Sequence, residues 1–390
     1  MVVSLVSPRL LMIGGGAVAR VAEVLAQLGL SRPLLVTDPW MASSGTVERV
    51  LAPLRAAGIT AQVFSDTVSD PTDTVVEAGV ATLRAGDFDC LIGFGGGSPM
   101  DTAKAMAILA AAPPGTHIRE FKVPAQANRA ALPVICIPTT AGTGSEATRF
   151  TVITDTERDE KMLIAGLGAL PLAAVVDYEL TFSVPPRTTA DTGIDSLTHA
   201  LEAFVSKRAN PEADEYALRA MRLIAPNLRT VYREPRNAKA REAMMLGATL
   251  AGLAFSNSSV ALVHGMSRPI GAHFHVPHGL SNAMLLPAVT EYSLPAALPR
   301  YAEAARAMGV ASAAEGDQSA AARLVEELRA LNRDLEVPTP RAYGIDEARW
   351  NALLPKMAEQ ALASGSPANN PRVPGTEEIL ALYRQCYAGA

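Results

Sequence analysis

The chain reads Leu91-Ile92-Gly93-Phe94-Gly95-Gly96-Gly97-Ser98-Pro99-Met100-Asp101-Thr102-Ala103-Lys104 across one junction, where an apolar strand meets three glycines and then a helix. Consecutive glycines let backbone N–H groups approach a pyrophosphate, and the N-terminus of a helix adds the positive end of its dipole. The Gly-Lys-Ser/Thr triplet of a P-loop is absent, which argues against an ATPase or GTPase. We interpret the junction as a nucleotide-phosphate turn, the alternative being a tight helix entry without a ligand. Asp101 and Lys104 lie on the first helical turns, where we expect a structural role.

Similar strand–helix junctions fill the first half of the chain. Short apolar runs alternate there with Ala- and Leu-rich helical stretches, which predicts βαβ units around a parallel sheet with ligands at the carboxyl ends of its strands. The fold class that follows is an α/β dinucleotide-binding domain with a Rossmann-like sheet. The predicted strands are Leu10–Ile13, Pro33–Thr37, Ile59–Phe64, Cys90–Phe94 and Val134–Pro138.

The pattern changes after Phe182, and from Thr188 onward apolar residues recur mostly at helical spacing. Consecutive prolines within Ser183–Arg187 end one element and form an extended joint. We therefore predict an α/β domain over residues 1–184 and an all-α domain over residues 185–390. Long Ala-rich helices are predicted at Ala213–Ile224, Ala238–Ala254 and Ala320–Leu331.

The composition excludes several classes of protein. Hydrophobic residues make up 49% of the chain and charged residues 19%, so a disordered or collagen-like chain is excluded. The formal net charge is −5 with no basic run, which argues against nucleic-acid binding. The cysteines form no Cys-x-x-Cys pair, so no disulfide framework or zinc ribbon is expected. Apolar stretches are broken before the ~20 residues of a membrane span, and we expect a cytoplasmic protein.

Two further loops resemble nucleotide-binding turns. Gly14-Gly15-Gly16-Ala17-Val18-Ala19 matches G-x-G-x-x-A after a strand, and Asp38 ends the next strand, where a carboxylate accepts hydrogen bonds from an adenosine ribose and repels the 2′-phosphate of NADP. A plain structural turn explains these glycines equally well. Pro138-Thr139-Thr140-Ala141-Gly142-Thr143-Gly144-Ser145-Glu146 also follows a strand and is rich in hydroxyls. Three such loops at strand ends predict one nucleotide-sized cleft.

The helical half contains a candidate metal site. Asp195 and His199 stand at positions i and i+4 of a predicted helix, so both side chains project from one face. Asp195, His199, His264 and one later histidine would give one carboxylate and three imidazoles, a donor set that suits Fe²⁺ or Zn²⁺. A surface pair is the alternative for the first two residues. The chain has 6 histidines, and four of them fall in one short window: His264, His273, His275 and His278.

These motifs together resemble the signatures of the iron-containing (group III) alcohol dehydrogenases, in the same order and over nearly the full length. The resemblance implies the architecture shared with dehydroquinate-synthase-like enzymes: an N-terminal dinucleotide-binding domain, a C-terminal helical metal-binding domain, and a cleft that holds NAD(H) and Fe²⁺, or Zn²⁺ in its place. The segments that carry the resemblance are Gly95–Lys104, Pro138–Glu146, Gly193–His199, His264, Pro277-His278-Gly279 and Asn370-Pro371-Arg372.

The resemblance also implies site residues. The metal ligands would be Asp195, His199, His264 and His278. The ribose carboxylate would be Asp38, and the pyrophosphate loop would be Gly96, Gly97 and Ser98, which favours the second glycine turn over the first. Further cofactor contacts would come from Thr139, Thr140, Thr148 and Lys161. Asp70 replaces the asparagine often found before Pro-Thr in this family, so the resemblance does not extend to that contact.

One departure from the family pattern concerns the proton path. Many members carry a second histidine four residues after the third ligand, whereas this chain has Arg268 there. Arginine stays protonated at working pH and cannot shuttle protons as imidazole does, so His275, a hydroxyl, ribose or water must carry the proton. We take His275 and Arg268 as candidate catalytic residues. Arg268 either favours a substrate with an anionic group or pairs with a nearby acid and points away.

The predicted function is reversible hydride transfer between a primary alcohol and NAD⁺ at a metal centre. Alternatives with the same fold are a polyol dehydrogenase, a maleylacetate-reductase-like enzyme, or an enzyme that uses bound NAD only transiently. A nucleotide-binding module with a structural metal is the alternative from another class. The expected partner is a small alcohol or aldehyde, with no nucleic acid and no membrane, and we expect a homo-oligomer, in the simplest case a dimer.

Overall fold

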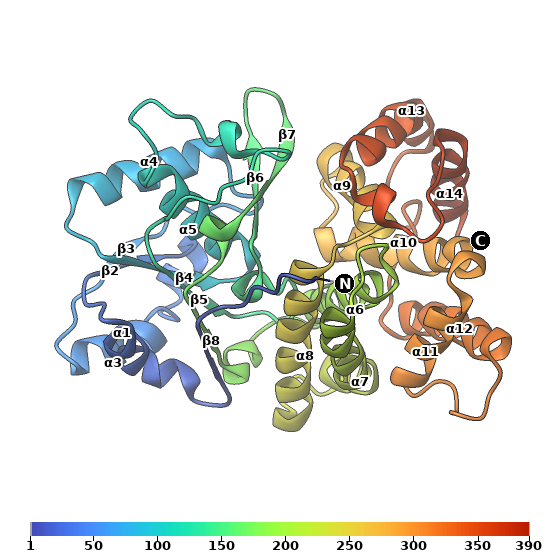
Figure 1. The fold of residues 1–390 in the computed structure, drawn as a ribbon, viewed down its shortest axis with the longest axis horizontal. Helices are drawn as coiled ribbons and strands as arrows, with labels where there is room; N and C mark the ends of the chain where they lie inside the picture. Colours follow the sequence, from blue (N-terminus) through green and yellow to red (C-terminus); the bar gives the residue numbers. More distant parts are fainter. Residues whose placement is uncertain (1, 390) are drawn as a thin grey trace. The chain divides into compact units, whose positions relative to one another are not determined.

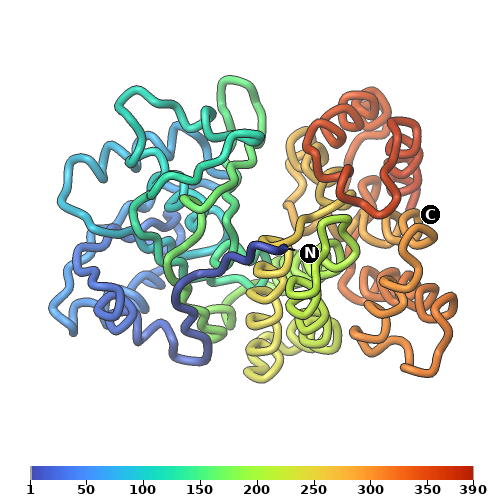
Figure 2. The backbone as a smooth tube through the Cα atoms, in the orientation of Figure 1, coloured from blue at the N-terminus to red at the C-terminus, as the bar shows by residue number. Residues whose placement is uncertain are grey.

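The computed structural model describes residues 2–389, and the chain divides into two compact units. The first unit is Leu5–Ser183, and the second runs from Val184 onward and includes the first few residues of the chain. In Figure 2 the first unit takes the blue-to-green part of the chain, and the second takes the yellow-green to red part. The sequence placed the boundary one residue later.

The first unit is built on a parallel sheet of six strands in the order β1-β8-β5-β4-β2-β3 (Figure 1). The central strand β4 is buried along its whole length because helices cover both faces of the sheet. The predicted parallel α/β sheet is therefore confirmed. The strands are β1 (Leu10–Ile13), β2 (Pro33–Val36), β3 (Gln62–Phe64), β4 (Cys90–Gly95), β5 (Val134–Pro138) and β8 (Ala173–Val176).

Side chains alternate between the two faces of this sheet and build two separate cores. Leu35, Ile92 and Ile135 pack on one face against α1 (Val21–Leu28) and α3 (Glu48–Ala56). Their neighbours Leu34, Leu91 and Val134 pack on the other face against α4 (Asp73–Ala85) and α5 (Gly97–Ala110). The period of two is that of a strand, and burial on both faces explains why these strands read as continuous apolar runs. The short α2 (Pro39–Ser43) follows β2.

Strands β4 and β5 pair in register, with Gly95 opposite Pro138. The amide of Thr139 then donates to the carbonyl of Gly95 at 2.9 Å. Two of the predicted nucleotide loops therefore leave the sheet side by side at the carboxyl ends of neighbouring strands.

Three strands were not predicted from the sequence. The antiparallel hairpin of β6 (Phe150–Asp155) and β7 (Glu160–Ala165) forms a second sheet. Strand β8 consists of two alanines and two valines, and because alanine is depleted in strands, local composition does not indicate one there. Pairing on both sides, with β1 and β5, holds this short segment in the sheet.

The second unit is helical, as predicted. Helix α6 is buried along nearly its whole length because α7, α8 and α10 pack around it. The helix begins directly after Pro185, with Pro186 at its first position, where a missing N–H costs nothing. The helices are α6 (Pro186–Val205), α7 (Pro211–Arg233), α8 (Ala238–Asn257), α9 (Leu262–Phe274), α10 (His278–Ser293), α11 (Leu298–Ala307), α12 (Asp317–Asp334), α13 (Glu347–Ala363) and α14 (Thr376–Ala388).

Within residues 2–389, no single helix is long and apolar enough to cross a membrane. The helices α8 and α9 reach that length and apolar character only when taken together, and they are bent by 105° relative to each other.

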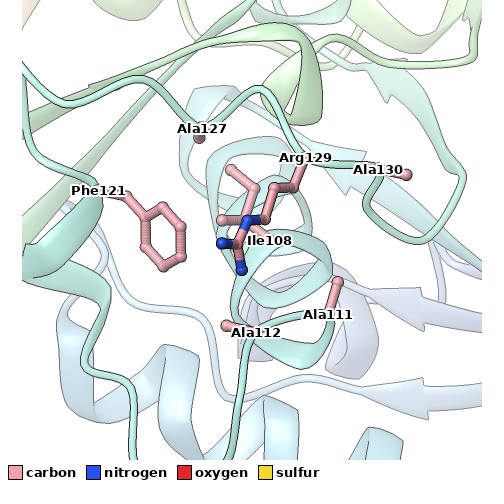
Figure 3. A pocket seen from close by; sticks show the side chains of 7 residues that line it. All are labelled: Ile108, Ala111, Ala112, Phe121, Ala127, Arg129 and Ala130. Atoms are coloured by element: carbon pink, nitrogen blue, oxygen red, sulfur yellow. The ribbon is translucent and has the colours of Figure 1, made fainter.

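A small pocket lies beside α5 in the first unit (Figure 3). Its lining is apolar except for Arg129, and it contains none of the predicted site residues. We therefore regard it as a packing feature of the helical layer. The lining residues are Ile108, Ala111, Ala112, Phe121, Ala127, Arg129 and Ala130.

Candidate metal centre and cofactor loops

Four side chains from three helices of the second unit converge on one point. Asp195 and His199 lie one turn apart on α6, His264 lies in the first turn of α9, and His278 is the first residue of α10. One donor atom from each of the four lies within 4.8 Å of the others. The structure thus brings together the four residues that the resemblance implied as ligands, and it selects His278 from the later histidines.

The separations between these donors suit a small divalent ion. The Oδ1 atom of Asp195 lies 3.5 Å from Nε2 of His264, 3.7 Å from Nε2 of His278 and 3.9 Å from Nε2 of His199. Donors about 2.1 Å from a tetrahedral ion lie roughly 3.4 Å apart. A small contraction would therefore complete the site. Three imidazoles and one carboxylate are the donors that Fe²⁺ and Zn²⁺ accept.

Glu202, which the sequence analysis did not identify, orients His264. Its Oε2 atom lies 2.7 Å from Nδ1 of His264 and accepts the amide of Ala261 at 2.8 Å, while Oε1 accepts the amide of Val263 at 2.6 Å. A carboxylate with these donors holds the imidazole proton on Nδ1 and turns the lone pair of Nε2 toward the cluster. The carboxylate therefore fixes both the tautomer and the start of α9.

Asn282 is the second residue that the sequence analysis missed, one turn after His278 on α10. Its Nδ2 lies 2.6 Å from Oδ1 of Asp195, 3.2 Å from Nε2 of His264 and 3.3 Å from Nε2 of His278. An amide nitrogen has two hydrogens, so it cannot satisfy three acceptors. Its own Oδ1 is buried and receives no hydrogen bond within residues 2–389. This excess of acceptors is the environment that a cation would complete.

The electrostatics of the cluster favour a positive charge. Burial raises the pKa of Asp195, but His199, His278 and His264 lower it by more, and the net pKa lies well below the usual range. Burial lowers the pKa of His264, but its hydrogen bonds to Asp195 and Glu202 outweigh that effect and raise it. Since a metal ion binds the deprotonated donors, it competes with protons for this site.

One side of the cluster is more open than the rest. The side chain of His278 is 40% exposed, whereas that of His199 is 6% exposed and those of Asp195 and His264 are 3% exposed. His199 stacks on Phe255 and on His264, with ring centroids 4.3 and 4.5 Å apart. The buried donors are thus rigid, and a further ligand could approach from the His278 side, as a catalytic site requires.

The role of Glu202 can be tested with Glu202→Gln, which keeps the size but replaces one acceptor oxygen with an N–H₂ group. We expect the affinity for Zn²⁺ to fall by about 10–100-fold, because His264 loses its orienting partner. Competition with a chromophoric chelator measures the affinity. The matched control is Glu291→Gln, an exposed residue of α10 paired with Arg329. Equal affinities in the two variants would contradict the role.

The second glycine turn leaves donors available at the start of α5. Gly96 precedes the helix and Gly97 opens it, and the first N–H groups of a helix have no intrahelical acceptor. A Cβ on Gly97 would lie 2.9 Å from Cγ2 of Thr143, whereas a Cβ on Gly96 would meet nothing closer than 3.9 Å. Gly97 thus packs against the neighbouring loop, and backbone approach at Gly96 stays open for a phosphate.

The first glycine turn is occupied by the protein itself. The carboxylate of Asp177, directly after β8, accepts the amides of Gly16 and Val18 at 3.2 and 3.1 Å. Tyr178 packs where a Cβ of Gly15 would lie. Of the two interpretations of Gly14–Ala19, the geometry supports the structural turn.

Lys104 and Asp101 hold the Thr139–Glu146 loop in place. Lys104 is fully buried, and its Nζ donates to the carbonyl and hydroxyl of Ser145 at 2.5 and 2.8 Å and to the carbonyl of Phe150 at 2.9 Å. Asp101 accepts the Ser145 hydroxyl at 2.7 Å. The Thr148 hydroxyl lies 3.4 Å from Lys104, so it faces the interior of the unit. Both charged residues are structural, as expected from their helical positions.

The other predicted cofactor residues lie at or near strand ends. Asp38 follows β2, and its Oδ1 caps α2 by accepting the amide of Met41 at 2.9 Å, which leaves the second oxygen for a ligand. Thr139 and Thr140 follow β5 directly. Lys161 lies on β7, and its amine is 2.7 Å from Asp70. Asp70, which replaces the asparagine often found there in the family, is therefore the ion-pair partner of Lys161.

The two candidate catalytic residues lie on and just after α9. Arg268 is one turn after His264, is partly buried, and donates to the Ser366 hydroxyl at 3.1 Å. His275 ends the helix in a left-handed conformation (φ 54°) and is exposed. His273 lies 2.7 Å from the side-chain oxygen of Gln360.

Comparison with known proteins gives a family for the whole chain. Residues 8–178 match the model of the iron-containing alcohol dehydrogenases, and residues 189–387 match the C-terminal model of the Fe-containing alcohol dehydrogenase family. Long-chain-alcohol dehydrogenase 1 of Geobacillus thermodenitrificans is 39% identical over 100% of this chain and 98% of its own. The NAD-dependent methanol dehydrogenase of Bacillus methanolicus is 35% identical over 95% and 96%. A crystal structure of 1,3-propanediol oxidoreductase, 36% identical, matches with a TM-score of 0.93 over 99% of this chain and 100% of the other.

The chain belongs to the iron-containing alcohol dehydrogenase family. The resemblance found in the sequence is thereby confirmed, together with the architecture and the class of enzyme: a metal-dependent alcohol dehydrogenase of a family that uses NAD(H) and iron. The comparisons give the polyol alternative no better support than the primary alcohol.

Proposed function

We propose that this chain interconverts a primary alcohol and its aldehyde with NAD(H), and that Asp195, His199, His264 and His278 hold the metal ion. The observation that carries the proposal is the convergence of these four donors within 4.8 Å in a chain of this family. Bound there, a divalent ion supplies a Lewis acid that lowers the pKa of an alcohol hydroxyl and polarises an aldehyde carbonyl.

The remaining work falls to residues of the chain. Glu202 and Asn282 keep the donors in place, and the open side at His278 admits the substrate oxygen. His275, exposed in the segment between two of the proposed ligands, can exchange a proton with solvent. The protein holds the substrate and the cofactor in fixed positions. This alignment brings the reacting carbon to the nicotinamide and excludes competing reactions.

For the cofactor, we propose that the amides of Gly96, Gly97 and Ser98 bind the pyrophosphate at the start of α5. The free oxygen of Asp38 accepts from the adenosine ribose and repels a 2′-phosphate, so NAD(H) is favoured over NADP(H). Thr139 and Thr140 begin the loop that Lys104 holds beside this turn through Ser145, and they are the proposed cofactor contacts. Thr148 follows the loop, and its hydroxyl faces Lys104 in the interior of the unit. Asp70 holds the amine of Lys161 in an ion pair, and we propose that this amine contributes positive charge to the cofactor site.

The relatives are named for substrates of very different size, from methanol through 1,3-propanediol to long-chain alcohols. We therefore propose the class of reaction, an alcohol–aldehyde interconversion, and infer the substrate from the residues of this chain alone. A homodimer and a cytoplasmic location stay predictions from the sequence.

The proposal is tested by following NADH absorbance with a panel of aldehydes, using protein loaded with Fe²⁺ or Zn²⁺ or treated with a chelator. We expect turnover with metal, a loss of about 100-fold or more after chelation, and recovery when metal is returned, because the ion stabilises the developing charge. NADH should bind equally well to chelated protein by fluorescence titration, and NADPH should be the poorer cofactor. Undiminished turnover after complete metal removal would overturn the proposal.

A further inference from the structure

Arg268 brings a charge into the second unit without an acidic partner. It is partly buried on α9, and its Nη1 donates to the Ser366 hydroxyl at 3.1 Å. Among residues 2–389 no carboxylate forms an ion pair with it. The acid that acts on it is Glu202: burial lowers the pKa of Arg268, and Glu202 only partly offsets this. Both oxygens of Glu202 already accept hydrogen bonds from the start of α9.

The other partly buried arginines of this unit have different neighbours. Five of them form ion pairs with carboxylates at 2.5 to 2.8 Å: Arg187 with Asp191, Arg229 with Glu327, Arg300 with Asp214, Arg306 with Asp317, and Arg329 with Glu291. Arg241 also forms no ion pair with a carboxylate of the described residues, but it is only 2% exposed and donates to a carbonyl and a hydroxyl of its own unit, so no ligand reaches it. Arg268 combines a missing acid with partial exposure.

Its position relates this charge to the metal cluster. Arg268 follows His264 by four residues on α9, so both side chains project from the same face, about 6 Å apart along the helix axis. The short helix Ser366–Asn369 supplies the hydroxyl that holds Nη1, and it packs on α9. A guanidinium has five N–H donors in a planar fork, and this contact uses one of them.

We propose that Arg268 is the binding site for an anionic group of the substrate, and that the substrate is an aldehyde or alcohol bearing a carboxylate a few carbons from the reacting carbon. The inference deepens the proposed function and rests on it. A partly desolvated guanidinium pairs with a carboxylate through two parallel hydrogen bonds. The substrate carboxylate would thus provide the ion-pair partner for Arg268. The short spacing from His264 limits the chain between carboxylate and carbonyl to a few carbons.

The test compares matched pairs of aldehydes with wild type and Arg268→Met. The pairs are 3-oxopropanoate with propanal, 4-oxobutanoate with butanal, and 5-oxopentanoate with pentanal. Wild type should prefer one carboxylated member by at least about 10-fold in kcat/KM. Arg268→Met should lose about 100-fold on that substrate, as truncation of one partner of a desolvated charge pair does, and less than about 3-fold on its neutral partner.

Two further variants keep the test independent of folding. Arg268→Lys retains the charge but not the fork, and should recover part of the preference. Ser366→Ala releases Nη1, and should raise KM for the carboxylated aldehyde with little change in kcat. The matched control is Arg329→Met, a partly exposed arginine paired with Glu291, which should leave both substrates unchanged.

A readout without turnover uses isothermal titration of metal-loaded protein with 4-hydroxybutanoate and with 1,4-butanediol, its neutral counterpart. The acid should bind at least about 10-fold more tightly to wild type, and this difference should vanish in Arg268→Met. Equal losses on both members of a pair, or a rise in KM for NADH alone, would overturn the proposal. Metal-dependent turnover of neutral aldehydes without any preference for carboxylates would overturn the anion site and leave the proposed function standing. Absence of all turnover together with equal binding would overturn both.

Discussion

His264→Ala should abolish metal binding and activity together. The imidazole of His264 faces Asp195 on one side and Glu202 on the other, at 3.5 and 2.7 Å, so its loss removes a proposed ligand and leaves the Glu202 carboxylate without that partner in a buried position. No neighbouring imidazole can take the place of His264, because His199 and His278 are already proposed ligands in the same cluster. We expect the bound metal to fall below one tenth per chain and activity to fall by about 1,000-fold or more.

The measurement is metal content by elemental analysis beside NADH titration and turnover. His273→Ala is the matched control: it removes an imidazole from the same helix, one that contacts Gln360. It should retain metal and activity. NADH should bind to both variants with the affinity of wild type, because the proposed cofactor turns belong to the other unit. Full metal occupancy in His264→Ala would remove this residue from the site.

Lys104→Met should destabilise the first unit and weaken NADH binding. The amine of Lys104 is enclosed and donates to Ser145 and to the carbonyl of Phe150. Methionine fills similar space but leaves these acceptors and Asp101 without the ammonium. Breaking a buried charged network of this kind costs about 3–5 kcal/mol, and the released loop no longer holds Thr139 and Thr140, the proposed cofactor contacts, in position.

Urea unfolding monitored by circular dichroism gives the free energy of unfolding, and fluorescence titration gives the NADH affinity. We expect the affinity to fall by about 10-fold or more, as each lost contact of the loop costs on the order of 1 kcal/mol. The matched control is Lys122→Met, whose amine is partly exposed and paired with Glu160; it should change stability by less than about 1 kcal/mol. Wild-type stability in Lys104→Met would contradict the network.

The two variants separate the functions of the two units. His264→Ala should lose metal and keep NADH binding, and Lys104→Met should keep the metal and lose NADH affinity. A variant that lost both properties would indicate general unfolding, which circular dichroism detects.

Much of the fold could be predicted because its signals are local. Strands Leu10–Ile13 and Val134–Pro138 have the bounds read from the sequence, since each is a short apolar run that turns or glycines interrupt. The third strand is shorter than predicted, Gln62–Phe64, because only those residues pair with β2. Strand β8 was missed because its strand conformation depends on β1 and β5, which are distant in the chain. The β6–β7 hairpin was missed although its two strands are adjacent in the chain and pair with each other.

The first glycine turn shows the same limit at a site. Its residues match a dinucleotide-binding pattern as well as a structural turn, and local sequence cannot separate the two. Asp177, more than a hundred and fifty positions later, occupies the amides of Gly16 and Val18. The contact that distinguishes the two interpretations therefore joins the ends of β1 and β8, which are neighbours in the sheet but distant in the chain.

The sequence by itself determined the chemistry of the candidate site. One carboxylate and several imidazoles, two of the donors at helical spacing, indicate a transition metal without knowledge of the fold, because donor type and local periodicity are properties of the residues themselves. The family resemblance already implied His278 as the fourth ligand, and the tertiary structure places it in the cluster. Only the tertiary structure decided that Glu202 and Asn282 support the cluster, and that Arg268 forms no ion pair with a carboxylate of residues 2–389. These facts depend on which distant helices meet, and a guanidinium shows whether its charge is balanced only when every neighbour is in place.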